Sequence, residues 1–279
     1  MAIITISRGS MSGGEALAEC LAAHLGYPSL AREVLVQAAK KLGVSEETLR
    51  GKVTKSARIW EKWTGDRRLY LIALQAALGE QCVSGNLVYH GNAGHLLLKG
   101  IPAVLRVRLI APMPVRIRTV MERKGLKYGD AQYYIKCADK DRVEWTKFVY
   151  GVNWRDPALY DMVLNLDHMT LETACLVISA TVKLPDYQVT EGVRKALADF
   201  VLACRVKLAL AMSALTRNIE FEVRADDGKV EIFGEIAAGG VLVRRAGPSE
   251  GDILTMVRTV DGVKDASISL RRFPEYSEP

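Results

Sequence analysis

The sequence predicts an α/β protein built on a parallel sheet with helices on both faces, followed by a smaller α+β unit. Over residues 1–182, short β-branched or apolar runs alternate with longer amphipathic segments, which is typical of strands joined by helical crossovers. After the stretch 183–192, the order becomes helix–strand–strand–helix–strand over residues 193–273. We therefore expect two units joined by a linker at 183–192, with a disordered tail at 274–279.

The elements of the first unit follow from periodicity and from helix stop signals. Leu17, Leu21 and Leu25 recur at helical spacing before Gly26, and a second amphipathic helix stops at Gly43. A capped helical start lies at 45–50, and a strong helix spans 66–80 with Asp66 as its expected N-cap. Strands are predicted at 3–7, 86–91, 103–112 and 160–166, and further helices at 113–125, 129–151 and 170–183.

The second unit is predicted from a long helical run and a hairpin signal. Residues 193–215 are helical in pattern, and two alternating strands surround Asp-Asp-Gly within 219–236. A helix with a glycine stop is expected over 249–263, and a last strand over 264–273. Together these elements give an αββαβ order.

Composition bounds the class of protein. The 279 residues are 49% hydrophobic, and no uncharged apolar run approaches the ~18 residues that a membrane span needs. No cationic leader precedes the first strand, so a signal peptide is not expected. The 5 cysteines are scattered without a Cys-x-x-Cys spacing. We expect them to be buried free thiols in a reducing compartment, with the cytoplasm as the location.

The net charge of +6 comes from the first 182 residues, since the remainder is close to neutral. A mildly basic region suits an anionic small ligand such as a nucleotide, and an ordinary solvated surface would look the same. Basic and acidic residues are interleaved, so nucleic acid is not an expected partner. The histidines lack metal-ligand spacing, so no metal site is predicted.

The stretch S-R-G-S-M-S-G-G joins the first strand to the first helix. Backbone N–H groups at a helix start have no intrahelical partners, so a glycine-rich turn there favours an anion. In parallel sheets ligands bind at the carboxyl ends of strands, where this loop lies. The loop is therefore either a phosphate cradle or a plain tight turn.

At this point the first 182 residues resemble the cytidylate-kinase-like proteins, which are relatives of bacterial CMP kinase. The resemblance runs through ITISRGSMSGGEALAECLAAHLGYPSLAREVL, VLRVRLIAP, RIRTVMERKGL, YYIKCADKDR and YGVNWRDPALYDMVLNLDHMTLETA. Its most specific piece is the spaced set Tyr150, Gly151, Trp154, Asp156, Pro157, Tyr160 and Asp161. The second unit is similar to a BON domain through Gly234, Gly262 and Val263, which implies a hydrophobic or lipid-like ligand or a protein partner.

The first resemblance implies a P-loop nucleoside-monophosphate-kinase fold. Such an enzyme transfers a phosphoryl group from ATP, with Mg²⁺, to a CMP-like acceptor. The implied donor-phosphate residues are Ser7, Arg8, Gly9, Ser10, Ser12, Gly13 and Gly14. The implied catalytic cluster on the lid side is Arg116, Arg118, Arg123, Asp139 and Arg142, and the implied substrate contacts are Asn92 and Asp161.

Several positions depart from the family pattern. Gly14 stands at the usual P-loop lysine, which the family commonly lacks, and Arg8 is the nearest candidate to replace that cation. Met11 replaces a glycine and is expected to crowd the phosphate approach, while Glu15 replaces an arginine. Other departures lie at Ala31, Asn92 and His95.

These departures leave three hypotheses about function open: an active kinase, a degenerate nucleotide- or anion-binding regulatory protein, and an interaction protein with a closed pocket. The arginines near 116–123 could instead form a solvated helix face. The aromatic residues Trp145, Phe148, Tyr150 and Trp154 could pack in the core or stack on a base. Asp161 could serve as a structural cap, and the oligomeric state stays open.

Overall fold

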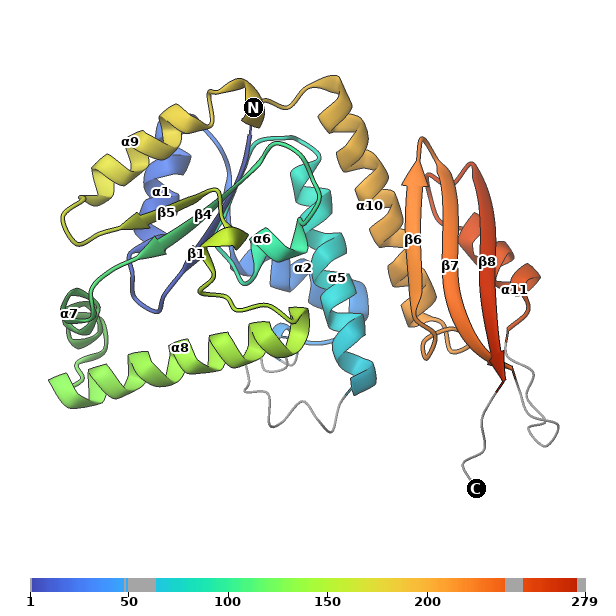
Figure 1. Ribbon diagram of the computed structural model, residues 1–279, viewed down its shortest axis with the longest axis horizontal. Coiled ribbons are helices and arrows are strands. Elements are labelled where there is room, and N and C mark those ends of the chain that lie inside the picture. Colours follow the sequence, from blue (N-terminus) through green and yellow to red (C-terminus); the bar gives the residue numbers. More distant parts are fainter. Residues whose placement is uncertain (1, 48, 50–63, 239–247, 275–279) are drawn as a thin grey trace.

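The computed structural model describes residues 2–47, 49, 64–238 and 248–274, and its first unit is a five-stranded parallel sheet. The strand order is β2-β3-β1-β4-β5, with β1 at the centre (Figure 1). The strands are β1 (Ile3–Arg8), β2 (Ser29–Leu30), β3 (Leu87–Tyr89), β4 (Val104–Ile110) and β5 (Met162–Asn165). The predicted parallel sheet is confirmed. Only β2 was not predicted, because two residues are too short to show a period.

Helices cover both faces of this sheet, as predicted. The helices of this unit are α1 (Gly14–Leu25), α2 (Arg32–Leu42), α5 (Thr64–Cys82), α6 (Gly94–Leu97), α7 (Met113–Lys124), α8 (Tyr128–Tyr150) and α9 (Leu171–Thr181). Of these, α1 and α9 pack on one face and α2 and α5 on the other, while α7 packs on α8. Gly26 and Gly43 end α1 and α2 in the left-handed conformation that favours glycine. The helix predicted from Asp66 begins at Thr64, so Asp66 lies inside it. The predicted start at 45–50 lies partly outside the described residues.

Alternating side chains of β1 feed two cores. Ile4 and Ile6 pack with α1 and α9 on one face, whereas Ile3 packs with α2 and α5 on the other. Burial on both faces is the usual state of a parallel strand and explains the unbroken apolar run at the start of the chain. The carboxyl end of β1, where its side chains leave these cores, is therefore fixed from both sides.

The cysteine prediction needs correction at one pair. Cys20 on α1 and Cys175 on α9 are joined as a disulfide, with Cα atoms 6.3 Å apart. The two helices pack side by side on the same face, which brings together thiols that are 155 residues apart in the chain. Cys82 and Cys204 are buried and free, as predicted, and Cys137 is free and half-buried.

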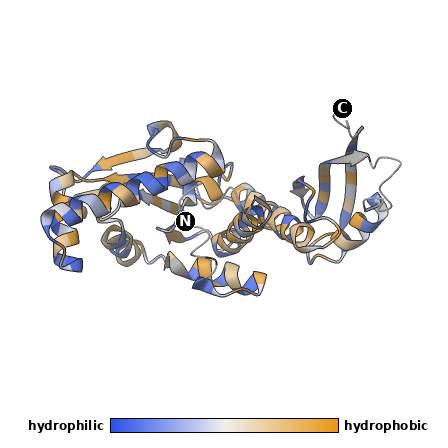
Figure 2. Ribbon diagram, turned by 90° about the horizontal axis from the view of Figure 1, so that it is seen from below, coloured by the Kyte–Doolittle hydropathy of each residue, from blue (hydrophilic) through white to orange (hydrophobic). Residues whose placement is uncertain are grey.

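The second unit contains α10 (Glu191–Met212), β6 (Phe221–Asp226), β7 (Lys229–Ala238), α11 (Glu250–Arg258) and β8 (Asp265–Pro274). This confirms the predicted αββαβ order. β6 pairs antiparallel with β7, and β7 pairs parallel with β8. Figure 2 shows hydrophobic and hydrophilic residues alternating along these strands. Helix α11 ends before the predicted glycine stop, and the likeness to a BON domain remains a prediction.

Helix α10 belongs to both cores. Leu197 and Leu208 pack with α5 and the first unit, whereas Val206 and Leu210 pack under the small sheet. The predicted linker 183–192 contains a 3₁₀ turn (Pro185–Tyr187), and its last two residues already belong to α10. The C-terminal unit is therefore anchored to the first unit along a helix. No helix in the described ranges is long and apolar enough to cross a membrane.

Gly79 marks the closest approach of α5 and α10. A Cβ at Gly79 would lie 3.0 Å from Phe200 Cε1 and 3.3 Å from Val201 Cγ2. We expect Gly79→Leu to lower the free energy of unfolding by about 1–3 kcal/mol, because overpacking forces the helices apart. Gly129→Leu on α8 is the matched control, since a Cβ at Gly129 meets nothing within 4 Å. Urea denaturation gives both values, and equal losses in the two variants would refute close packing at Gly79.

Candidate functional site

The loop between β1 and α1 curls at the carboxyl end of the central strand. Met11 has φ 58° and Gly13 has φ 81°, so two loop residues are left-handed. Left-handed residues in such a turn are typical of anion-binding nests, in which successive N–H groups point toward one centre. Here the N–H of Ser12 donates to Gly9 O at 3.3 Å within the loop. The first N–H groups of α1, which begins at Gly14, add to this. Ser12 is buried, and its hydroxyl has no hydrogen-bond partner among the residues described.

Arg8 lies across Gly14. A Cβ at Gly14 would overlap the Cδ atom of Arg8, so the arginine stem runs where a lysine at position 14 would begin. Its guanidinium donates to the carbonyl oxygen of His90 at the end of β3. Burial lowers the pKa of Arg8 and nearby Glu15 opposes that shift, and an arginine stays charged in either case. The cation beside Gly14 is therefore the side chain of Arg8, which comes from the end of β1, whereas the P-loop pattern has a lysine at the position of Gly14.

Met11 is expected to crowd the phosphate approach, and the structure places it in an apolar contact. Its side chain packs against Ile117, Val120 and the start of α8. Glu15 is compensated, because Arg123 on α7 donates to its carboxylate at 3.1 Å. This pair is exposed on both sides, so its contribution to stability is small.

Asp139 ties the loop to α7 and α8. Its carboxylate accepts from the backbone N–H of Ser10 at 3.0 Å and from Arg116 Nη2 at 2.7 Å. Arg116 also donates from Nε to Ser10 O at 2.7 Å, and Arg142 donates to Arg8 O at 2.8 Å. Both arginines therefore hold backbone carbonyls of the loop. One loop N–H that could bind a phosphate is already occupied by a carboxylate.

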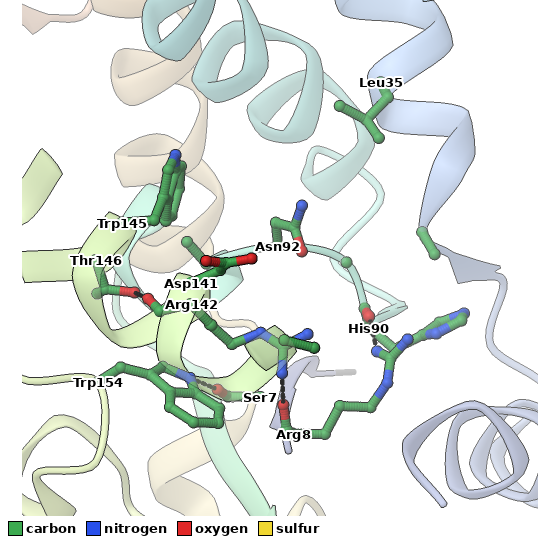
Figure 3. Close-up of a pocket in the computed structure, with 14 residues that line it drawn as sticks. Ser7, Arg8, Leu35, His90, Asn92, Asp141, Arg142, Trp145, Thr146 and Trp154 are labelled. Carbon is green, nitrogen blue, oxygen red and sulfur yellow. Dashed lines mark hydrogen bonds between the residues drawn. The ribbon is translucent and has the colours of Figure 1, made fainter. Parts of the chain in front are cut away.

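A pocket of about 420 Å³ opens beside this loop, between the start of α2 and the middle of α8 (Figure 3). Arg8 and Arg142 are its cations, and Trp145 and Trp154 form apolar walls. Figure 3 shows Asp141 and Asn92 projecting into the same opening. Asp141 forms no ion pair with any described residue.

A buried cluster beneath the pocket was not predicted as a unit. Trp154 donates from Nε1 to Ser7 Oγ at 2.7 Å, and Tyr160 donates to Trp154 O at 2.9 Å. The guanidinium carbon of Arg108 lies 4.5 Å from the centre of the Trp154 ring, and that of Arg142 lies 5.2 Å away. Trp154 and Tyr160 belong to the spaced set of family residues in the sequence, and that set is the sequence signal that could have found them. Arg108 had no sequence signal beyond its strand.

Not every predicted site residue joins the site. Of the predicted catalytic cluster, Arg116, Asp139 and Arg142 come together, whereas Arg123 pairs with Glu15 and Arg118 is exposed. Asp161 lies outside the pocket lining and forms a two-pronged pair with Arg106, at 2.6 and 3.1 Å. Burial raises the pKa of Asp161, but the hydrogen bonds from Arg106 outweigh it and lower that pKa overall.

Of the donor-loop residues, Gly9 allows close approach, since a Cβ there would lie 3.3 Å from the Arg116 guanidinium. Ser7 is committed to Trp154, as described above. Asn92 and Ala31 line the pocket, and the role of Asn92 as a substrate contact stays a prediction. Over the described residues, no group of three or more His, Cys, Asp or Glu side chains is placed to hold a metal ion.

His95 is buried under the pocket against Tyr160, with ring centroids 4.7 Å apart. Burial, with the charges of Arg106 and Arg108, lowers its pKa from 6.5 to about 4. The unfolded chain therefore binds the proton more strongly. This residue contributes its full stability above pH 6.5 and loses it as the pH falls toward 4.

We expect the free energy of unfolding to fall by up to about 3 kcal/mol from this one group over that range. Urea denaturation at a series of pH values measures the slope. His95→Leu is expected to flatten the slope between pH 6.5 and pH 4. An unchanged slope in that variant would mean that His95 is not the group responsible.

The chain is similar to known proteins in sequence and in fold. A model of the cytidylate kinase-like family matches residues 3–168. The cytidylate kinase of Thermococcus kodakarensis is 26% identical over 183 residues, covering 64% of this chain and 87% of the relative. That of Methanopyrus kandleri is 28% identical over 183 residues, covering 64% and 92%. A solved structure of an uncharacterized protein from Eubacterium ventriosum shares the fold, with a TM-score of 0.52 at 20% identity over 65% of this chain and 98% of its own.

Proposed function

Because the chain belongs to the cytidylate kinase-like family, we propose that it transfers the terminal phosphoryl group of Mg-ATP to a nucleoside monophosphate. The observation that carries this proposal is the position of Arg8, which crosses Gly14 and reaches the pocket wall at His90. A cation at this point neutralises charge on the phosphates between donor and acceptor. We also propose that the protein works in the cytoplasm.

The donor phosphates would lie on the loop. Its left-handed turns, the start of α1 and the hydroxyl of Ser12, which has no hydrogen-bond partner among the described residues, fit the oxygens of a polyphosphate. Mg²⁺ would arrive with the ATP and be held mainly by phosphate oxygens and water, as is usual for this ion. An oxygen of the acceptor phosphate forms a bond to the γ-phosphorus while the bond from that phosphorus to the β–γ bridging oxygen breaks. ADP leaves, and the acceptor becomes a diphosphate.

The acceptor base would lie at the other end of the pocket. The Trp145 ring offers a stacking surface, and the carboxylate of Asp141, which pairs with no cation among the described residues, can accept from an exocyclic amine. Asn92 can donate to a ring carbonyl on the same edge of the base, two ring positions from the carbon that carries the amine. Cytosine presents this pair of groups, whereas uracil would place a carbonyl oxygen against a carboxylate. We therefore propose CMP as the preferred acceptor, in keeping with the name cytidylate kinase that the relatives carry.

Phosphoryl transfer is tested with Mg-ATP and each of CMP, UMP, AMP and GMP, by measuring ADP and diphosphate formation. We expect turnover with CMP at least tenfold faster than with UMP. Formation of no diphosphate from any acceptor would refute the kinase assignment.

A second function is favoured by the carboxylate of Asp139 on the Ser10 N–H. If this contact persists when nucleotide binds, the loop holds fewer phosphate contacts, and the protein acts as a nucleotide-binding regulator without turnover. Calorimetric titration separates the two functions. Binding of CMP and Mg-ATP without diphosphate formation supports the regulator, and binding with turnover excludes it.

A further inference from the structure

A second pocket of about 420 Å³ lies where the C-terminal unit meets the first unit. Its walls come from α5, α6 and the end of α8 on one side, and from α10 and β6 on the other. It shares no lining residue with the nucleotide pocket. Neither unit forms this junction pocket alone, so it exists only because α10 packs onto α5.

The lining of the junction pocket is amphipathic. Ile72, Leu96 and Phe221 are buried and give it an apolar floor. Lys207 on α10 is half-buried and forms no ion pair with any residue that the structure describes. Arg68 donates to the carbonyl oxygen of Ile219 and has no carboxylate partner within those ranges. Two cations against one exposed acid, Glu220, leave the pocket with a positive balance.

We propose that the junction pocket binds a small amphiphilic anion, with its charged head at Lys207 and its apolar tail on the floor. A half-buried ammonium without a counter-ion gains from a bound anion, and an apolar floor gains from a tail. The volume is within the usual range of small-molecule sites. By contrast, the open face of the small sheet carries exposed charges such as Glu222, Arg224 and Glu231, which do not suit a lipid tail.

The junction pocket is connected to the nucleotide pocket by two short paths. Ala93, the N-cap of the short helix α6, lines the nucleotide pocket, and Leu97, at the end of that helix, lines the junction pocket. Gln75 donates to Leu97 O at 3.0 Å and fixes this turn to α5. On α8, the Trp145 ring in one pocket contacts the Tyr150 ring in the other, with centroids 5.9 Å apart. A ligand in the junction pocket would therefore contact residues that are packed against the walls of the nucleotide pocket.

Direct binding is measured by calorimetry with decanoate, below its micelle concentration and without nucleotide. We expect one site, and binding at least tenfold weaker in Lys207→Glu. Lys99→Glu is the matched control, because Lys99 is exposed and lines neither pocket. Absence of decanoate binding, or equal weakening in both variants, would overturn the proposal. Since no nucleotide is present, this outcome is independent of whether the protein is a kinase.

The connection between pockets is tested by titrating CMP with and without saturating decanoate. We expect the Kd of CMP to change at least threefold in the wild type and to stay constant in Lys207→Glu. Linkage requires CMP to change the Kd of decanoate by the same factor. A CMP affinity that does not respond to bound decanoate would refute communication between the pockets.

Discussion

Replacing Arg8 with methionine is expected to lower kcat for CMP phosphorylation by about 10²–10³-fold, the usual effect of losing one preorganised charge contact to a transferring group. Methionine keeps the length of the stem over Gly14 and removes only the charge and its donors. The effect is expected in kcat more than in KM, because negative charge is redistributed among the phosphate oxygens in the transition state.

Two further variants make this result specific to Arg8. Arg8→Lys keeps a positive charge on a shorter reach and is expected to recover part of the activity. Arg217→Met is the control for charge loss, since Arg217 is exposed and is not among the residues that line the nucleotide pocket. If Arg8→Met retains kcat within a factor of two of the wild type, the cation that replaces the P-loop lysine is not Arg8.

Asp139→Asn is expected to lower the free energy of unfolding by about 3–5 kcal/mol, which is the usual cost of removing one partner of a buried ion pair. Arg116 and Asp139 are 8% and 7% exposed, so loss of the carboxylate leaves a buried guanidinium without a counter-charge. Asparagine keeps the shape and one carbonyl oxygen, so the loss reports charge rather than volume.

The matched control is Asp161→Asn, at a pair whose arginine side chain is 40% exposed. There we expect a loss of about 1 kcal/mol or less, because solvent screens the charge. Urea denaturation at constant pH measures both variants. Equal losses would mean that the Asp139 cluster is not the buried support of the loop.

The contact between the two units and the lining of the junction pocket involve the same helices, α5 and α10. α10 packs on α5, and α5 carries part of the junction pocket, so substitutions such as Gly79→Leu test the same interface from the packing side. If the junction pocket binds its ligand as proposed, Gly79→Leu is expected to weaken the binding of decanoate as well as lower the free energy of unfolding.

Much of the fold could be predicted from the sequence, because strands and helices depend on local patterns. The apolar run of β1, the leucines of α1 and the hairpin around Asp-Asp-Gly each lie within a short window, and all are confirmed. The glycine-rich loop was also predicted from its position between a strand and a helix. The two-residue strand β2 was missed because its period is too short to detect.

The order of the elements and the position of the glycine-rich loop can therefore be predicted from the sequence, since both follow from neighbouring residues. The partners of that loop depend on tertiary packing. Asp139 meets Ser10 across 129 residues, and Trp154 meets Ser7 across 147. Tertiary packing also placed Met11 against α7 and α8, joined Cys20 to Cys175 and placed α10 in both cores. These contacts depend on how whole helices pack on the sheet, and no local spacing encodes that packing.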